Sequence, residues 1–228
     1  MNILAFDTST EYFSVSLALG DEAYSHECRA GQQHSALLLP SVSRLLAEAG
    51  IGLRQLDCIA FGSGPGSFTG LRIACAAAQG LAFGLDVPVV GISTLLALAE
   101  ASGADRAIAV LDARMGEIYH AAYEKKLSGW NEFVAPNLCK ADVAPPAEGA
   151  NWVGVGNAFA VYPALQERYA RQLSRIDAEL FPHAKHILSL AKIEFLAGRA
   201  FAAELAAPVY IRNKVAMTQV EQRQGIKG

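Results

Sequence analysis

Charged side chains are scarce in this sequence. Asp, Glu, Lys and Arg make up 18% of the 228 residues, whereas about 25% is usual, and hydrophobic residues make up 52%. Intrinsic disorder requires the opposite balance, low hydrophobicity with high net charge, so disorder across the whole chain is excluded. The length and the apolar surplus together predict a folded chain whose core needs no disulfide or metal.

Neither sign of charge is concentrated anywhere. Lys and Arg number 19 and Asp and Glu number 22, which gives a formal net charge of -3. A protein that binds nucleic acid by itself normally carries a clustered basic surface, and no basic run is present, so we do not expect autonomous nucleic-acid binding. The first residues reach Asp7 without the basic start and apolar core of a signal peptide, so we expect a cytoplasmic protein.

Cysteines with metal-binding spacing are also missing. The four cysteines are far apart and form no Cys-x-x-Cys motif: Cys28, Cys58, Cys75 and Cys139. We expect reduced, structural thiols and no metal site. Among the histidines, His183 and His186 are close together, and two interpretations stay open for them. They form a metal pair if a carboxylate joins them, or they belong to the solvated start of a helix after Pro182.

No apolar run is long enough for a membrane span. The most apolar one, residues 71–85, contains Arg72 and Gln79 and falls about five residues short of the length that a span needs. We therefore expect a buried helix of a soluble fold and no membrane partner.

Apolar periodicity and turn residues divide the first hundred residues into strands and helices. Three short strands come first and predict an antiparallel meander. A helix, a buried strand, a glycine-rich loop, an apolar helix, a strand and a further helix follow. In order, the predicted elements are residues 2–7, 13–19, 23–29, 33–49, 58–62, 63–70, 71–85, 87–92 and 93–101.

The same order of strands and turns returns about 100 residues later. A strand at 107–111 ends in Asp112, as the first strand ends in Asp7, and strands at 117–123 and 152–157 follow. This internal repeat predicts a duplicated α/β fold.

Two related lobes with a cleft between them follow from the repeat. We expect an N-terminal lobe over residues 1–103 and a smaller C-terminal lobe over residues 104–228, with the tail after residue 207 not placed. Residues 136–149, which include two consecutive prolines, are expected to be irregular.

The glycine-rich loop at 62–70 is the most informative segment. Its glycines allow close backbone approach, and the N–H groups at the start of the following helix favour an anion. The loop is not a Walker A motif, because Leu71 stands where Lys is required, and Thr69 replaces the third glycine of a dinucleotide-binding motif. The alternative is a tight strand-to-helix turn without a ligand.

Polar residues at the end of the first strand add a second candidate for phosphate binding. They could hold a metal-bound phosphate through the carboxylate and the hydroxyls, or simply form a hairpin turn. The cofactor-binding residues predicted from both segments are Asp7, Thr8, Ser9, Gly64, Gly66 and Ser67. Arg114 stays open in the same way, since it could clamp an anion or pair with Asp112.

One face of the apolar helix is nearly flat, because Ala76, Gly80 and Gly84 recur every four residues. Such a face lets another helix approach closely. That helix is either the one at 33–49 in the same chain or one from a partner, and we expect both helices to contribute to a dimer interface. The residues predicted for this interface are Leu38, Val42, Leu45, Arg72, Ala76, Gly80 and Phe83.

Five segments spread over nearly the whole chain carry a family resemblance. They are residues 3–10 (ILAFDTST), 33–40 (QHSALLLP), 62–73 (GSGPGSFTGLRI), 112–119 (DARMGEIY) and 208–212 (PVYIR). With these segments the sequence resembles the TsaB family of tRNA threonylcarbamoyladenosine biosynthesis proteins. The resemblance implies the two-lobed fold shared by actin, sugar kinases and Hsp70-type ATPases, the ASKHA or ribonuclease H-like fold, with mixed sheets flanked by helices.

The resemblance also implies a role. TsaB is a paralogue of TsaD, which transfers a threonylcarbamoyl group to the adenosine beside the anticodon of ANN-decoding tRNAs and binds a metal through a His-x-x-x-His pair. The corresponding helix here, 93–99, has no histidine, and Leu and Ala offer no metal ligand. The resemblance therefore implies a non-catalytic subunit without a metal site of its own.

The partners implied by the resemblance are three. The chain would bind and activate TsaD, support recruitment of the ATPase TsaE, and pair with a second copy of itself. Any ATP, ADP or metal would belong to the partners or to an interface, and tRNA would be contacted only through the complex.

Two other functions stay open. Asp7 and the glycine-rich loop could serve a nucleotide-binding enzyme of the ATPase or kinase class. A metallopeptidase is disfavoured, because the His-x-x-x-His pair is missing.

Overall fold

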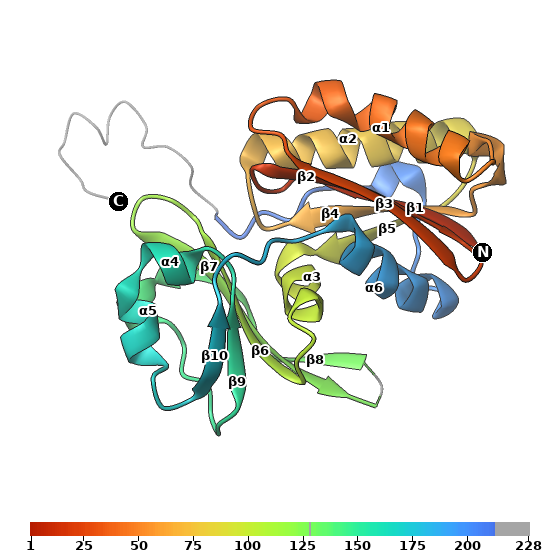
Figure 1. Ribbon diagram of the computed structural model, residues 1–228. Helices are drawn as coiled ribbons and strands as arrows, with labels where there is room; N and C mark the ends of the chain where they lie inside the picture. Colours follow the sequence, from red (N-terminus) through yellow and green to blue (C-terminus); the bar gives the residue numbers. More distant parts are fainter. Residues whose placement is uncertain (128, 213–228) are drawn as a thin grey trace.

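The computed structural model describes residues 1–127 and 129–212, which form two lobes with a five-stranded sheet in each (Figure 1). The first sheet has the strand order β3-β2-β1-β4-β5, and the second has the order β8-β7-β6-β9-β10. The two orders are the same once strands are counted within each lobe. The duplicated α/β fold predicted from the internal repeat is therefore confirmed.

The first sheet is mixed. β1 (Asn2–Asp7), β2 (Tyr12–Leu19) and β3 (Glu22–Arg29) form the antiparallel meander expected from the sequence, and β4 (Cys58–Gly64) and β5 (Val89–Ser93) add to β1 in parallel. Short turns suffice for the antiparallel pairs, whereas the parallel strands require helical crossovers.

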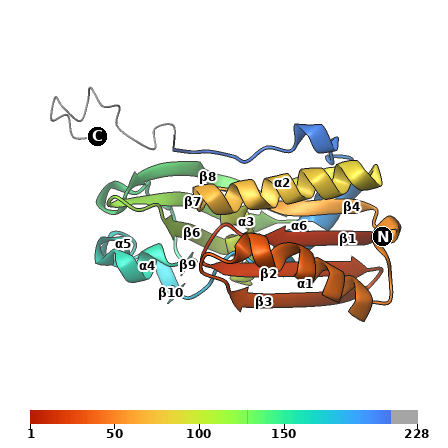
Figure 2. The same cartoon turned by 90° about the horizontal axis from the view of Figure 1, so that it is seen from above.

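Helices cover both faces of this sheet (Figure 2). They are α1 (His34–Glu48) and α2 (Phe68–Leu85) on one face and α6 (Ala184–Leu196) on the other. Because successive strand residues point to opposite faces, Leu4 and Phe6 of β1 pack with α1 and α2, while Ile3 and Ala5 pack with α6. The first sheet is therefore buried on both sides, which explains why residues 3–6 of β1 are all apolar.

The second sheet repeats this arrangement with smaller helices. Its strands are β6 (Arg106–Asp112), β7 (Glu117–Lys126), β8 (Gly129–Lys140), β9 (Trp152–Val155) and β10 (Leu173–Asp177). On one face lie α4 (Ala158–Val161) and α5 (Pro163–Arg168), and on the other α3 (Thr94–Ala101). α3 also contacts β4 and β5, so it lies between the lobes.

The predicted C-terminal lobe is wrong in one respect. The second sheet is complete at residue 177, and α6 then returns to pack against the first sheet. The chain that follows stays with the first lobe as far as η3 (Ala203–Leu205), since Phe201 pairs with Val89 of β5 and η3 contacts α2. The apolar face of α6 fits the face of the first sheet that α1 and α2 leave open.

Two element boundaries also differ from the prediction. Residues 129–140 form a strand that pairs with β7 through register shifts, where we expected an irregular stretch from 136. α2 begins at Phe68 instead of Leu71, because Ser67 caps it, and has 18 residues.

Among the described residues α2 is the one helix whose length and composition would allow a membrane span. Six of its residues are buried in the first lobe: Gly70, Leu71, Ala74, Cys75, Ala78 and Ala82.

Candidate functional site

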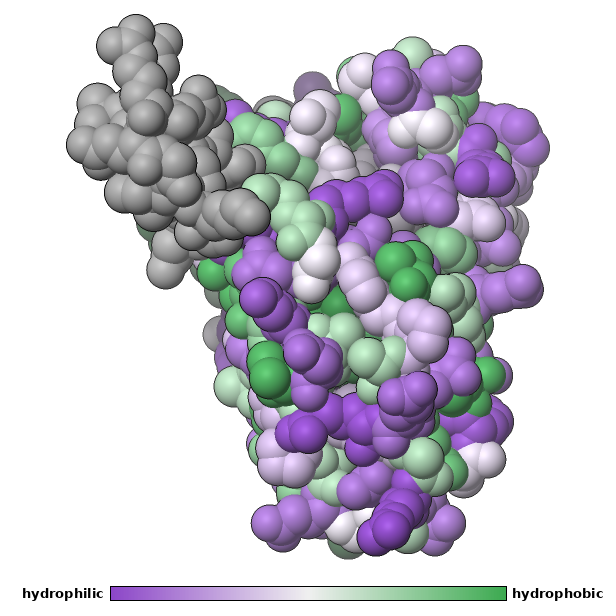
Figure 3. All heavy atoms as spheres, turned by 90° about the vertical axis from the view of Figure 1, so that its left-hand side faces the viewer, coloured by the Kyte–Doolittle hydropathy of each residue, from purple (hydrophilic) through white to green (hydrophobic). Residues whose placement is uncertain are grey.

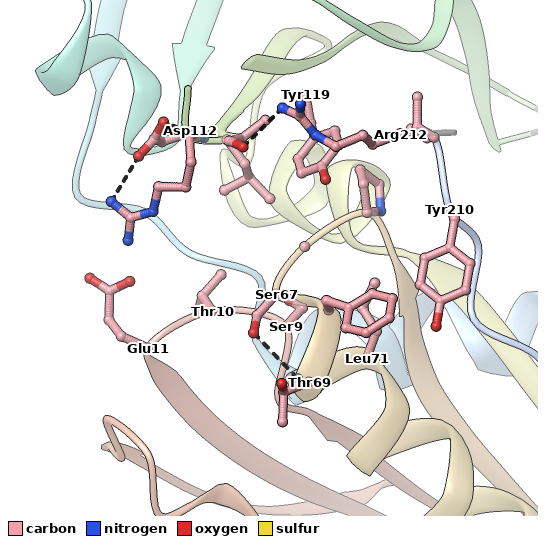
Figure 4. Close-up of a pocket in the computed structure, with 18 of the residues that line it drawn as sticks. Ser9, Thr10, Glu11, Ser67, Thr69, Leu71, Asp112, Tyr119, Tyr210 and Arg212 are labelled. Carbon is pink, nitrogen blue, oxygen red and sulfur yellow. Dashed lines mark hydrogen bonds and ion pairs between the residues drawn. The ribbon is translucent and has the colours of Figure 1, made fainter. Parts of the chain in front are cut away.

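The ends of β1 and β6 open into one cleft of about 800 Å³ between the lobes (Figure 4). Residues 9–11 and 65–71 form the first-lobe wall, residues 111–115 together with Tyr119 form the opposite wall, and residues 209–212 close a third side. The two strand-end turns that the repeat predicts as equivalent therefore meet at the same place.

The carboxylate of Asp7 lies beneath the cleft and does not line it. Its Oδ1 accepts hydrogen bonds from the backbone N–H and the hydroxyl of Ser9, at 3.0 and 2.8 Å. Its Oδ2 is buried and has no hydrogen-bond partner among the described residues, and a Cβ on Gly62 would lie 2.0 Å from it. Burial raises the pKa of Asp7 from 3.8 to about 6.

The glycine-rich loop brings the start of α2 against the end of β1. A Cβ on Gly70 would lie 1.9 Å from the carbonyl oxygen of Thr8, and a Cβ on Gly66 would lie 2.6 Å from that of Ser9. The Thr8 hydroxyl donates to the Gly70 carbonyl at 2.6 Å, and the Ser67 N–H donates to the Ser9 carbonyl at 2.7 Å. These glycines are therefore required for protein packing, whether or not a ligand binds.

The charges on the second-lobe wall are paired. Arg114 lies 3.1 Å from Asp112 Oδ2, with 84% of its side chain exposed, and its backbone N–H donates to Asp112 Oδ1 at 2.9 Å. The Tyr162 hydroxyl donates to the same oxygen at 2.9 Å. Of the two interpretations of Arg114, the pair with Asp112 is the one that the structure contains.

The third side of the cleft is polar and aromatic. Arg72 Nε donates to the Tyr210 hydroxyl at 2.9 Å, and its guanidinium carbon lies 3.7 Å from the ring centre of Phe68. Arg212 lies 2.6 Å from the carboxylate of Glu117 in β7. Two ion pairs therefore border the cleft, Arg114 with Asp112 and Arg212 with Glu117.

Comparison with known proteins establishes the family. The TsaD family, described as tRNA N6-adenosine threonylcarbamoyltransferase, matches residues 28–220. The tRNA threonylcarbamoyladenosine biosynthesis protein TsaB of Haemophilus influenzae is 37% identical over 98% of this chain and 99% of its own length. This chain belongs to the TsaB family. TsaB of Escherichia coli is 36% identical over 98% of this chain and 100% of its own. The solved structure of YeaZ from Pseudomonas aeruginosa is 39% identical, covers 92% of this chain and 99% of that one, and has a TM-score of 0.83.

The ASKHA-type fold that the TsaB resemblance implied is confirmed by this comparison and by the duplicated sheets. The predicted cofactor-binding residues, however, separate into two groups. Ser9, Gly66 and Ser67 line the cleft, whereas Asp7, Thr8 and Gly64 do not. Asp7 and Thr8 are fully buried, so the prediction that they contact a phosphate is wrong for this structure. A metal-bound phosphate does not fit at Asp7, because the carboxylate is fully buried and does not line the cleft.

The predicted interface residues separate in the same way. Leu38, Val42 and Leu45 are buried in the core of the first lobe, so their assignment to a partner surface is wrong. They recur at helical spacing and all face the sheet. The other four predicted residues are exposed along α2: Arg72, Ala76, Gly80 and Phe83. None of them belongs to the buried core of this lobe.

The other candidates from the sequence are the histidine pair and the cysteines. His183 Nδ1 lies 3.1 Å from Glu27 of β3, and the described residues contain no group of three or more His, Cys, Asp or Glu that could hold a metal. Burial raises the pKa of the Cys58 and Cys75 thiols. His183 precedes α6 as its N-cap, in agreement with the helix-start interpretation.

Sequence reasoning missed the contribution of residues 209–212 to the cleft. This segment contributed to the family resemblance but received no role, because nothing local in it indicates which part of the chain it contacts. The one available signal was its composition, an aromatic residue and an arginine two positions apart, Tyr210 and Arg212.

Proposed function

We propose that this chain acts in tRNA N6-threonylcarbamoyladenosine biosynthesis as a non-catalytic subunit that binds and activates a TsaD partner. The names of its relatives in Haemophilus influenzae and Escherichia coli support the pathway. The absence of histidine from Thr94–Ala101 supports the non-catalytic role, because TsaD is expected to hold its metal on the corresponding helix.

The proposal that a partner binds to α2 rests on an exposed stripe of this helix. We define this stripe as Arg72, Ala76, Gly80, Phe83 and Gly84, all of which are exposed. Phe83 leaves 75% of its surface accessible. An added Cβ on Gly80 or Gly84 would meet nothing within 4 Å, so the backbone itself is open to contact.

The stripe combines small residues with an exposed aromatic side chain. Polar residues predominate on the face that carries α4 and α5, with apolar residues scattered among them (Figure 3). Small residues at every fourth position let two helices approach closely, and an exposed aromatic beside them is typical of an interface centre. A helix of TsaD, or α2 of a second copy, fits this surface best.

The other partners follow from this assembly. TsaE would join the complex after TsaD binds, and tRNA would be contacted only through the complex, since the chain has a net charge of -3 without a basic run. We expect ATP or ADP to bind a partner or an interface, and the complex to work in the cytoplasm.

The stripe is tested by the substitution Gly80→Arg. Placing a long cation on the flat face should weaken the complex with TsaD by at least about 100-fold and abolish tRNA modification, because burying an unpaired charge at an interface is costly. Sedimentation of the purified chains and mass spectrometry of tRNA nucleosides measure the two effects.

A matched control places the same arginine in the other lobe. Ala160 is exposed on α4, so Ala160→Arg should leave the complex intact. Circular dichroism should report the wild-type fold for both variants. A Gly80→Arg chain that binds TsaD with wild-type affinity would show that the stripe is not the interface.

A nucleotide-binding enzyme is the second candidate. It is favoured by the cleft, into which Ser9, Gly66 and the amino end of α2 project. Calorimetry with ATP and Mg²⁺ and a hydrolysis assay on the isolated chain distinguish the two, because a non-catalytic subunit should give no turnover. Stoichiometric zinc or iron in the purified chain would instead revive the metallopeptidase.

A further inference from the structure

Residues 208–212 connect the two lobes. η3 packs against α2, where Gln79 Nε2 donates to the Glu204 carbonyl at 3.4 Å. The chain then runs along α2 toward the second lobe (Figure 2). The Val209 N–H donates to the Ser63 carbonyl at the end of β4, at 2.7 Å. The segment is therefore attached to the first lobe by its backbone before it crosses.

An aromatic contact adds to the attachment on the first lobe. The ring of Tyr210 lies 5.5 Å from that of Phe68, between centroids. The guanidinium of Arg72 contacts both, because it lies over the Phe68 ring and donates to the Tyr210 hydroxyl at 2.9 Å. Cation–π and hydrogen-bond contacts of this kind fix the direction of the segment.

Arg212 attaches the segment to the second lobe. One guanidinium nitrogen lies 2.6 Å from Glu117 Oε2, and the other donates to the Ala113 carbonyl at 3.1 Å. The Arg212 side chain is 14% exposed, which reduces solvent screening of the pair. Both partners belong to the β6–β7 hairpin, where Arg114 and Met115 adopt positive φ angles of 64° and 57°. The hairpin therefore presents the carbonyl and the carboxylate in a fixed geometry.

The position of this segment distinguishes it from the other links between the lobes, which are α3 and the chain at 178–183. α3 contacts both sheets, yet this helix, described in full, contributes no residue to the lining of the cleft. Residues 209–212 do line the cleft. The lobes are thus joined by α3, by the chain at 178–183 and by residues 208–212, and of these links the last one lines the cleft.

We propose that residues 208–212 form a latch that fixes the angle between the lobes and so sets the width of the cleft. Releasing the latch leaves α3 and the chain at 178–183 as the hinge about which the lobes move apart. The Arg212 side chain is the part of the latch that opens, because its contacts with Glu117 and the Ala113 carbonyl join the segment to the second lobe.

The distance between the lobes tests the latch directly in the full chain. Spin labels at Ser43→Cys on α1 and Glu167→Cys on α5, both exposed, report it by electron–electron double resonance. Cys28→Ser and Cys139→Ser remove the accessible native thiols. Arg212→Ala should raise the population with longer distances about tenfold, as expected for the loss of a charge-assisted hydrogen bond.

A matched control is Arg199→Ala. Arg199 also forms a close ion pair, with Glu194, but both residues lie beside the first lobe. The control should keep the wild-type distance distribution. Tyr210→Ala removes the first-lobe contact and should open the lobes as Arg212→Ala does, which keeps the test available if one variant folds poorly.

An unchanged distribution in both latch variants would overturn the proposal. So would an equal change in Arg199→Ala, because that result would indicate general loosening. The measurement uses the isolated chain, so its outcome does not depend on the proposed binding of TsaD.

Discussion

The buried carboxylate of Asp7 makes the folded chain sensitive to pH. Its Oδ2 has no hydrogen-bond partner among the described residues, and burial raises its pKa from 3.8 to about 6. At about 1.4 kcal/mol for each pKa unit, the ionised form costs the folded state about 3 kcal/mol relative to the unfolded chain. This cost is a large fraction of the stability of an ordinary domain.

The sign of the effect follows from which state holds the proton. Below pH 3.8 Asp7 is protonated in both states, so no charge has to be buried. As the pH rises from 3.8 through about 6, the unfolded chain loses the proton first, and the free energy of unfolding falls. Above about pH 6 both states are ionised and the full cost applies.

The substitution Asp7→Asn removes the charge and keeps the shape. We expect the variant to be more stable than the wild type by up to about 3 kcal/mol at pH 8, and the difference to shrink by about that amount at pH 4. Urea unfolding at both pH values measures it. Subtracting the wild type cancels every other titrating group, and comparing the two pH values then cancels any constant cost of the unpaired amide.

The control is Asp21→Asn, which removes a carboxylate from an exposed turn. Its difference from the wild type should stay within about 0.5 kcal/mol at both pH values. If the difference between Asp7→Asn and the wild type is the same at pH 4 and pH 8, the buried carboxylate is not the source of the pH dependence and the reasoning fails.

Two further pairs of substitutions test the packing. Gly70→Ala should destabilise the chain by about 3 kcal/mol, because its Cβ would lie 1.9 Å from the Thr8 carbonyl oxygen. Gly80→Ala in the same helix should stabilise the chain by about 0.5–1 kcal/mol, because a Cβ there meets nothing within 4 Å and alanine favours the helix. Thermal unfolding measures both, and a loss at Gly80 would contradict the open space above that residue. Leu45→Ala should lower the free energy of unfolding by about 2–5 kcal/mol, because Leu45 is 0% exposed. Leu39→Ala should change it by no more than about 0.5 kcal/mol, because Leu39 is 56% exposed. Equal effects in urea unfolding would contradict the orientation of α1.

Most of the fold was predictable because its signals are local. Period-2 alternation and turn residues identified the meander of β1, β2 and β3, and helical spacing identified α1. The order of strand ends and glycine turns revealed the duplication. The return of α6 to the first sheet was not predictable, since an amphipathic helix shows which face is apolar but not which sheet covers it.

The site was less predictable than the fold. Asp7 has the residue type and the position of a ligand-binding acid, yet it is fully buried, and its free oxygen lies only 2.0 Å from where a Cβ on Gly62 would be. Leu38, Val42 and Leu45 have the spacing of an interface helix, and the same spacing also fits a helix that covers a sheet. A pattern shows that side chains share a face, whereas burial decides what that face contacts.

The sequence by itself determined the secondary structure of the first lobe, the duplication and the resemblance to the TsaB family, because these depend on local periodicity and on specific strings of residues. Only the tertiary structure decided that residues 9–11, 65–71 and 111–115 share a cleft, that residues 208–212 span it, and that the stripe on α2 remains exposed. Contacts between residues more than 90 positions apart, such as Arg212 with Glu117, depend on how the elements pack and leave no trace in any short window of sequence.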